Sequence, residues 1–529
     1  MHLRTRLQRH ARRCADERGF TMLLAVFVLT VTTLLLGGAY IAVLDDTALS
    51  RNDLDQKRAY AAAEAGIQAY NYQLNQNVNY WETSCSALTG TVPGSTDSGS
   101  TEKYSVQIHV ASTAPSTDNV CDTANPIATL IEGSSAGTAA GTFRVTSTGT
   151  SVNASGTVLA TRTLVAQYRS PSFLNYVYYT DYETLDPSAL SGDPTDCAVH
   201  YPNRGRDCGS PIDFVTGDAI NGPLHSEDTL AICGSPVFGR TSADQIEAPG
   251  HSTEGQGGCS DGMIPTVGHY NPTAPSLTPP STNAQLLNVT QSAFHFTGVT
   301  TIVLNAGQMS VNGGAYVNDP TNGVVYVSTS SAGCPVTYTP FTATYTGNTG
   351  CGNVYVSGNY NTSLTIASDN DIIINGNIIP SGTPLTSPPT APTGTALLGL
   401  IANDYVRIYH PVTPARDSSS DCGTSRGGNV SNDTGSLTDP YIYAAILAVN
   451  HSFIVDNYDC GNQLGTLHVY GAIAQLFRGP VGTIGNSGYL KDYRYDDRLA
   501  TTEPPYFLNP VSAHWSVSRE TECDVTASC

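Results

Sequence analysis

The feature that most constrains this chain is an uninterrupted apolar stretch near its N-terminus. Residues 20–44 hold no charged side chain. As an α-helix they would extend about 37 Å at 1.5 Å per residue, which is enough to cross a bilayer. The preceding residues 1–19 carry six arginines against two acids, a net charge of +4. Because arginines mark the cytoplasmic side of a membrane helix, everything after Leu44 is expected outside the membrane.

The composition excludes several classes of protein. Only 13% of the 529 residues are charged, and 50 glycines and 31 prolines make turns and uncharged polar surface dominant, so the chain is not a helical bundle. The net charge of −20 opposes contact with phosphate backbones, so nucleic acid is not expected as a partner. At about 100–200 residues per domain, the length allows several domains.

Cysteine usage agrees with an extracytoplasmic location. Of the 13 cysteines, only Cys14 precedes the apolar stretch. The remaining even number, without the tight spacing of a zinc site, predicts disulfides in an oxidising compartment and no metal centre. These disulfide candidates are Cys85, Cys121, Cys197, Cys208, Cys233, Cys259, Cys334, Cys351, Cys422, Cys460, Cys523 and Cys529. Local pairing is expected, first of Cys197 with Cys208 and of Cys334 with Cys351, although spacing alone does not fix the connectivity.

Three interpretations compete for residues 1–44: a cleaved secretory signal, an uncleaved anchor, and a prepilin leader followed by a pilin helix. A secretory signal has an apolar region of about 7–15 residues, and the run here is longer. Residues 17–24, ERGFTMLL, resemble the prepilin-peptidase site of type IV pilins. The resemblance implies cleavage between Gly19 and Phe20 by a prepilin peptidase, methylation of the new N-terminus, and retention of the whole helix on the mature protein.

The next segment adds to this resemblance. Residues 58–67, RAYAAAEAGI, look like the AAEAG region of PilX-type minor pilins. An apolar stripe with helical spacing runs through Tyr60, Ala63, Ile67, Tyr70 and Leu74. The family resemblance implies assembly with other pilins or pseudopilins through the helix, including Thr21, Leu24 and Leu44. Most pilins carry glutamate where this chain has Leu24, which by resemblance indicates a minor subunit.

The body of the chain is predicted to be rich in β-strands, so the fold class is α+β or mainly β. Alternating runs at residues 104–110, 142–148 and 157–168 predict a small antiparallel sheet, and residues 141–149, GTFRVTSTG, resemble the first head strand of type IV pilins. After residue 171, short β-branched runs end at Asn or Gly. This texture favours a right-handed parallel β-helix, with a β-sandwich as the alternative.

The expected domain organisation follows from these segments. It comprises a leader (1–19), a membrane and amphipathic helix (20–75), a sheet subdomain (76–170), a β-helix-like head (171–510) and a C-terminal tail (511–529). Residues 222–230, with Ile232 and Gly234, resemble the opening turn of the bodies that follow PilX-type N-termini in large secreted pilin-like proteins, and residues 495–499 with 504–507 resemble their closing segment.

Charged clusters in the head are candidate sites for a polysaccharide lyase or hydrolase, and a lyase needs a carboxylate cage for calcium and a base. The candidates are Asp369 and Asp371 near Arg407; Asp492, Asp496 and Asp497 with Arg494 and Arg498; and, as metal ligands, His225, Glu227 and Asp228 or His251, Glu254 and His269. No HExxH or P-loop motif accompanies them. Since Asp and Asn favour turns, no catalytic residue, metal or cofactor is expected.

The sequence therefore predicts a minor type IV pilin or pseudopilin that is not an enzyme. It would span the cytoplasmic membrane once, hold its head outside, and reach a pilus or the cell surface after assembly. The 29 tyrosines suit either an amphipathic surface for adhesion or carbohydrate contact, or packing at the corners of a β-helix, and both interpretations stay open. The alternative is a membrane-anchored β-helix enzyme acting on surface polysaccharide.

Overall fold

The computed structural model describes residues 18–523 with internal gaps. The residues left out are 1–17, 78–79, 84–86, 93–99, 110–141, 170, 191–194, 206–207, 210, 264–266, 336–337, 341–342, 344, 346–348, 414–429, 436, 484, 501, 512–514 and 524–529. Four disulfide candidates, Cys85, Cys121, Cys422 and Cys529, lie outside the described residues.

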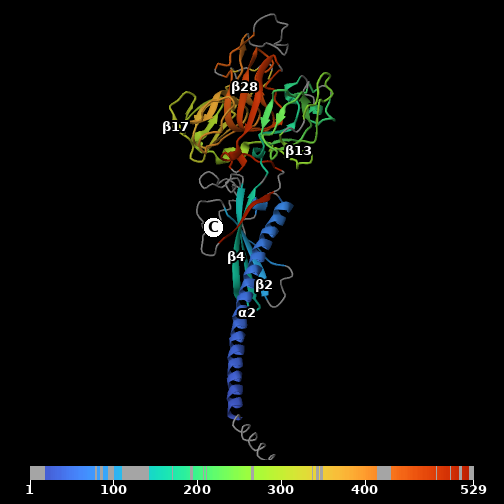
Figure 1. Cartoon of the computed structure of the whole chain (residues 1–529). Helices are drawn as coiled ribbons and strands as arrows, with labels where there is room; N and C mark the ends of the chain where they lie inside the picture. The colour runs from blue at the N-terminus through green and yellow to red at the C-terminus, as the bar shows by residue number, and fades with distance from the viewer. Residues whose placement is uncertain are drawn as a thin grey trace, which may run out of the picture.

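One long helix and a small sheet form the N-terminal unit (Figure 1). Helix α2 (Arg18–Gln76) is continuous over 59 residues and is followed by the short α3 (Tyr80–Thr83). The C-terminal half of α2 lies on a five-stranded antiparallel sheet. The strands in spatial order are β1 (Leu88–Thr91), β2 (Ser100–His109), β3 (Thr142–Asn153), β4 (Val158–Arg169) and β31 (Ser516–Cys523).

The edge strand β31 changes the expected domain organisation. Residues 511–529 were expected to be a tail, but residues 516–523 return to the N-terminal unit and pair antiparallel with β4. The head is therefore inserted between two neighbouring strands of one sheet. Figure 1 shows the consequence: β31, red, lies beside the cyan strands of a much earlier part of the chain.

The head is built mainly from parallel strands. One parallel ladder contains, in spatial order, β13 (His269–Asn271), β11 (Gln245–Glu247), β8 (Leu224–Ser226), β5 (Tyr178–Tyr182), β28 (Gln463–Phe477), β26 (Tyr441–Ala448), β22 (Leu398–Ala402), β20 (Leu364–Ser368), β18 (Val324–Ser328) and β14 (His295–Thr297). A second contains β15 (Thr300–Asn305), β19 (Val354–Tyr360), β21 (Ile372–Pro380), β23 (Val406–Ile408) and β27 (Phe453–Val455).

Shorter parallel ladders complete the head. β30 (Ser487–Tyr495) joins β28 to β7 (Ala219–Asn221) and β10 (Val237–Phe238), while β9 (Leu230–Cys233) lies between β6 (Phe214–Val215) and β12 (His251–Ser252). Antiparallel excursions are formed by β16 (Gln308–Val311), β17 (Val317–Asn318), β24 (Val412–Thr413), β25 (Ser431–Asn432) and β29 (Gly482–Thr483). The 3₁₀ turns are η2 (Phe173–Asn175), η3 (Pro187–Ala189), η4 (Thr195–Cys197), η5 (Ala284–Val289), η6 (Ser292–Phe294) and η8 (Asp497–Ala500).

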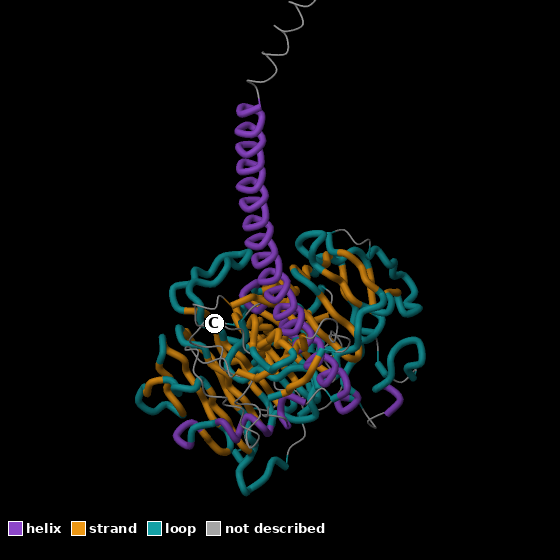
Figure 2. The backbone as a smooth tube through the Cα atoms, turned by 90° about the horizontal axis from the view of Figure 1, so that it is seen from below, coloured by secondary structure: helices purple, strands orange, loops and turns teal. Residues whose placement is uncertain are grey.

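The head sequence begins at β5, in the middle of the first parallel ladder, which runs from β13 to β14. From β5 it proceeds outward to β13 at one end, and residues 272–294 then cross to β14 at the other end. This crossing segment is held by Asn283, whose Nδ2 donates to Ser368 O at 2.8 Å and to Ile401 O at 3.0 Å. From β14 the chain returns inward until β28 pairs with β5. The head consequently extends to both sides of α2 (Figures 1 and 2).

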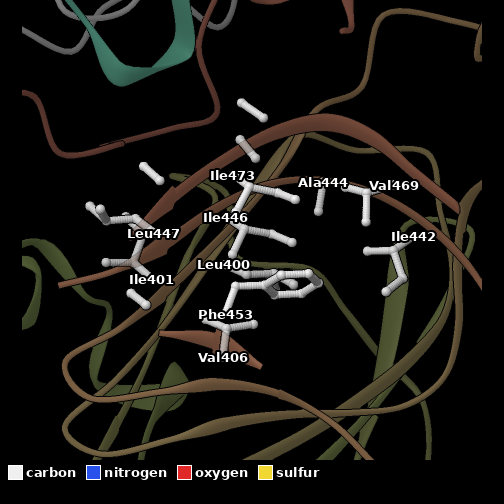
Figure 3. Close-up of a cluster of buried hydrophobic side chains, with 14 of the residues drawn as sticks. Leu400, Ile401, Val406, Ile442, Ala444, Ile446, Leu447, Phe453, Val469 and Ile473 are labelled. Atoms are coloured by element: carbon white, nitrogen blue, oxygen red, sulfur yellow. The ribbon is translucent and has the colours of Figure 1, made fainter. Parts of the chain in front are cut away.

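Aliphatic side chains in register fill the interior of the head (Figure 3). Leu400, Ile446 and Ile473 are direct neighbours in the ladder and are fully buried. Burying one such side chain is worth about 1.5–3 kcal/mol, and β-branched residues suit the extended backbone. The structure thus confirms a mainly β chain with a long N-terminal helix and an antiparallel sheet.

Three disulfides join cysteines that are close in sequence. Cys197 pairs with Cys208 and Cys334 with Cys351, as predicted, and Cys233 pairs with Cys259. Cys460 and Cys523 are also disulfide-bonded. The pairs close loops in the head, where they restrict the unfolded chain.

Candidate assembly helix and charged clusters

The N-terminal half of α2 projects away from the rest of the molecule (Figures 1 and 2). Its Thr21–Ile41 segment has a mean hydropathy of 2.3 and is 0% buried. Gly19 and Phe20 lie in the first turns of this helix, Thr21 and Leu24 are exposed, and Leu44 lies within the helix. An exposed apolar surface of this length needs a cover, either lipid or neighbouring apolar helices.

The C-terminal half of α2 packs on the sheet through a row of very small residues. Ala59, Ala62 and Ala63 are fully buried, and Gly66 is buried as well. Gly149 of β3 faces this row: a Cβ at Gly149 would lie 2.0 Å from the backbone oxygen of Ala59. The AAEAG stretch therefore has a local physical role, because its small side chains let the helix backbone approach the sheet closely.

Further along α2, larger side chains pack against the same sheet. Ile67, Tyr70 and Leu74 are buried, as the predicted stripe required, but Tyr60 is 38% exposed and does not belong to the buried face. The reason is that Ala59 and Ala62, rather than Tyr60, face the sheet in that part of the helix. Two sheet residues also hold the helix backbone, since Ser147 Oγ donates to Ala63 O at 2.6 Å and Tyr168 OH donates to Ile67 O at 3.2 Å.

Arg169, the last residue of β4, ties the sheet to the head. Its guanidinium donates to the backbone oxygens of Leu499 and Ala500 in η8, and it lies 3.9 Å from the Glu503 carboxylate. Glu503 is buried, and burial raises its pKa to about 7 although the neighbouring Arg169 lowers it. This contact lies where the chain passes between the N-terminal unit and the head.

The proposed carboxylate cage around Arg407 is a buried ion cluster. Arg407 Nη1 lies 2.9 Å from Asp371 Oδ2, and its Nε lies 2.9 Å from Asp456 Oδ1, with all three side chains at most 5% exposed. Asp369 points elsewhere and accepts a hydrogen bond from Tyr326. The guanidinium of Arg407 is paired with two carboxylates, so this buried cluster offers no accessible base and no open calcium cage.

The second group of acids is divided among separate ion pairs. Asp492 lies 3.0 Å from Arg494, and Asp496 lies 2.6 Å from Arg498. Asp497 is 72% exposed and pairs instead with Arg240 from a distant turn, at 2.9 Å. These acids are neighbours in sequence, but each pairs with a different arginine, and Arg240 also pairs with Asp244.

Of the proposed metal ligands, His225 and Glu227 lie together, and the others are engaged in separate contacts. Asp228 and Glu254 both pair with Arg204, which lies 3.3 Å from Glu254 Oε2. The pKa of Glu254 is raised to about 7, and burial of its carboxyl group is the largest cause. His251 contacts Asp261 at 2.7 Å, and His269 is exposed. Among the described residues, the only groupings with metal-like spacing include Cys197 with Cys208 or Cys233 with Cys259, and these sulfurs are used in disulfides.

His225 is the most constrained of these histidines. Its Nδ1 lies 2.8 Å from Glu247 and its Nε2 lies 2.9 Å from Glu227. Carboxylates only accept hydrogen bonds, so both ring nitrogens donate and the ring is a cation. Burial opposes this charge, but the two hydrogen-bonded carboxylates outweigh it and raise the pKa of His225 above its ordinary value.

This cluster predicts a pH dependence of stability. A folded-state pKa above the unfolded value of about 6.5 gives stabilisation that is complete at lower pH and is lost as the pH rises through the folded value. We expect His225→Gln to reduce the fall in unfolding free energy between about pH 6 and about pH 8, measured by denaturant titration. His200 and His451, whose pKa values are also raised, would retain the remainder. The control is His269→Gln, and an unchanged slope in His225→Gln would contradict the assignment.

The residues that receive the helix were missed by the sequence analysis. Ser147, Gly149 and Tyr168 lie on β3 and β4 and contact α2, and Trp515 follows the head. The ring of Trp515 lies 4.8 Å from that of Phe143. Only the glycine that ends the GTFRVTSTG stretch was a usable signal, since glycine within a strand often marks a close backbone approach.

No protein-family model matches the chain, and no curated protein matches it. Among solved structures, it is similar to the competence-associated pilin ComZ from Thermus thermophilus, with 11% sequence identity and a TM-score of 0.28. The similarity covers 88% of this chain and 97% of that one.

Proposed function

We propose that this protein is a minor pilin or pseudopilin of PilX type that carries a large extracytoplasmic head. The observation that carries the proposal is the division of α2: Thr21–Ile41 is apolar and has no buried residue, while the same continuous helix packs its second half tightly on an antiparallel sheet. Such a segment can rest in the membrane and later exchange lipid for neighbouring helices at little cost.

The leader supports a route from the membrane into a filament. Cleavage after Gly19 by a prepilin peptidase would remove the arginine-rich segment and leave Phe20, methylated, at the start of the helix. Leu24 is exposed on that helix, and the chain has no acid between Phe20 and Asp45 to offset the new terminal ammonium. This arrangement supports a minor subunit rather than the repeating one.

The head supports a role in recognition. Consecutive strands from β18 to β23, and again β26 to β28, alternate between two parallel ladders, which favours a parallel β-helix over an antiparallel sandwich. We propose that this head binds a surface or carbohydrate ligand and catalyses no reaction. The charged groups considered for catalysis are engaged with one another, as the Arg407 cluster illustrates.

Blocking the leader site tests the proposal. We expect Gly19→Val to retain residues 1–19 and to remain in the membrane fraction, because a branched side chain replaces the smallest one at the scissile bond. Wild type should also occur, in its shorter form, among filaments sheared from the native cells. Gly38→Val is the matched control, because a Cβ at Gly38 meets nothing within 4 Å; its N-terminus should be processed normally. Finding unprocessed Gly19→Val in sheared filaments would contradict the proposal.

A further inference from the structure

Lys491 is one of only three lysines in the chain and lies inside the head. The register of β30 on β7 pairs Asp492 with Ala219, so the preceding residues, Lys491 and Asp218, are also neighbours. Lys491 Nζ lies 2.7 Å from Asp218 Oδ2. The Lys491 side chain is 12% exposed and that of Asp218 is 2% exposed. The parallel pairing of β30 with β7 therefore places the amine of Lys491 next to the carboxyl group of Asp218, where little water can enter.

The surroundings favour an uncharged, nucleophilic amine. The Phe214 ring centroid lies 5.9 Å from Lys491 Nζ and 3.6 Å from the guanidinium carbon of Arg478. Burial lowers the pKa of Lys491 and the charge of Arg478 lowers it further, which together outweigh the opposing effect of Asp218. An amine without its proton carries the lone pair needed for attack on a carbonyl carbon.

We propose that Lys491 and Asp218 are joined by an intramolecular isopeptide bond. The buried ammonium–carboxylate pair becomes an amine and a carboxylic acid by transfer of one proton. The Nζ lone pair then attacks Asp218 Cγ, forming a C–N bond, and a C–O bond breaks. One carboxyl oxygen leaves as water with one proton from the amine and one from the acid, so the step needs no oxidant, reductant or other reactant.

Two features of the site promote this condensation. Fixed neighbours have an effective concentration that reaches about 10⁵–10⁸ M in well-oriented intramolecular reactions, which favours amide formation over hydrolysis. Arg478 is held by Glu183 at 2.8 Å through Nη1, while its Nη2 has no hydrogen-bond partner among the described residues. The positive charge and free donor of Arg478 can stabilise the negative oxygen that develops on Asp218 during attack.

The bond would join the two halves of the head. β7 follows β5 in the part of the head that precedes the crossing segment, and β30 is the last head strand before the chain returns to the N-terminal unit. A link between residues 273 positions apart in sequence would covalently join these early and late parts of the head where β7 pairs with β30. The two parts would then stay together even when other contacts break.

Peptide mapping of the native full-length protein tests the proposal. After reduction, alkylation and trypsin digestion, we expect residues 207–240 to be covalently linked to residues 479–494, with a combined mass lower by one water. Trypsin should fail to cut after Lys491, because an amidated lysine is not a substrate. Recovery of separate peptides 207–240 and 479–491 at full mass would overturn the proposal and leave a buried ion pair.

Exposed Lys57 provides a matched control within the same chain. Its Nζ also lies 2.7 Å from a carboxylate, that of Asp53, but these side chains are 73% and 64% exposed. We expect Lys57→Arg to retain the linked peptide, and Lys491→Arg and Asp218→Ala to abolish it. A linked product at Lys57 and Asp53 as well would contradict the requirement for burial. The readout is independent of leader processing, so it can fail without affecting the proposed assembly role.

Discussion

Replacing Arg407 with methionine should lower the free energy of unfolding by about 3–5 kcal/mol, because removing one partner of a buried ionic cluster leaves uncompensated charge. Asp371 and Asp456 would both lose their cationic partner in a site where all three side chains are at most 5% exposed. The measurement is denaturant unfolding in detergent, followed by circular dichroism, to which the strands of the head contribute most.

A partly exposed arginine gives the control for this experiment. Arg162 lies 2.8 Å from Glu522, and their side chains are 33% and 39% exposed. Exposed pairs contribute about 0–1 kcal/mol, so Arg162→Met should change the unfolding free energy little. If Arg407→Met were as stable as Arg162→Met, the cluster would not be structural, and a catalytic role for Arg407 would regain support.

The second large effect is expected at the contact between α2 and the sheet. Gly149→Ala should destabilise the N-terminal unit by about 3 kcal/mol, because the new methyl group meets backbone atoms of Ala59 and Ala63 at 2.0 and 2.2 Å and the helix must shift. The two tryptophans of the chain, Trp81 and Trp515, both lie in this unit, with ring centroids 5.9 Å apart. Tryptophan fluorescence therefore reports this transition selectively.

Gly257 supplies the matched glycine for this substitution. It is exposed, a Cβ there meets nothing within 4 Å, and Gly257→Ala should leave the fluorescence transition unchanged. An unchanged transition in Gly149→Ala would show that the helix does not lie as close to β3 as described. The Arg407 and Gly149 variants together separate the stability of the head from that of the helix and sheet.

Local patterns in the sequence predicted much of the N-terminal unit. The alternating runs at residues 104–110, 142–148 and 157–168 overlap β2, β3 and β4, because one face of each strand is buried under α2. The predicted disulfides of Cys197 and Cys334 join cysteines 11 and 17 residues apart, and such short separations restrict the choice of partner.

The features that could not be predicted depend on contacts between distant segments. Strand β31 is a partly exposed edge strand containing Arg519 and Glu520, so it lacks the alternating apolar pattern that marks β4, its partner. Asp456, which completes the Arg407 cluster, lies 49 residues further along the chain. Nothing local indicates that β5 lies in the middle of the ladder, because its two neighbours there, β8 and β28, come from opposite ends of the head sequence.

The most direct test of the proposed role is N-terminal sequencing, with intact mass, of the protein extracted from the membranes of its native host. We expect a mature chain that begins at Phe20 with a methylated amine and keeps the complete apolar helix. A chain that begins at Met1 would be a static anchor, and a chain that begins after residue 42 would be an ordinary secreted protein. Either result would contradict assembly through α2.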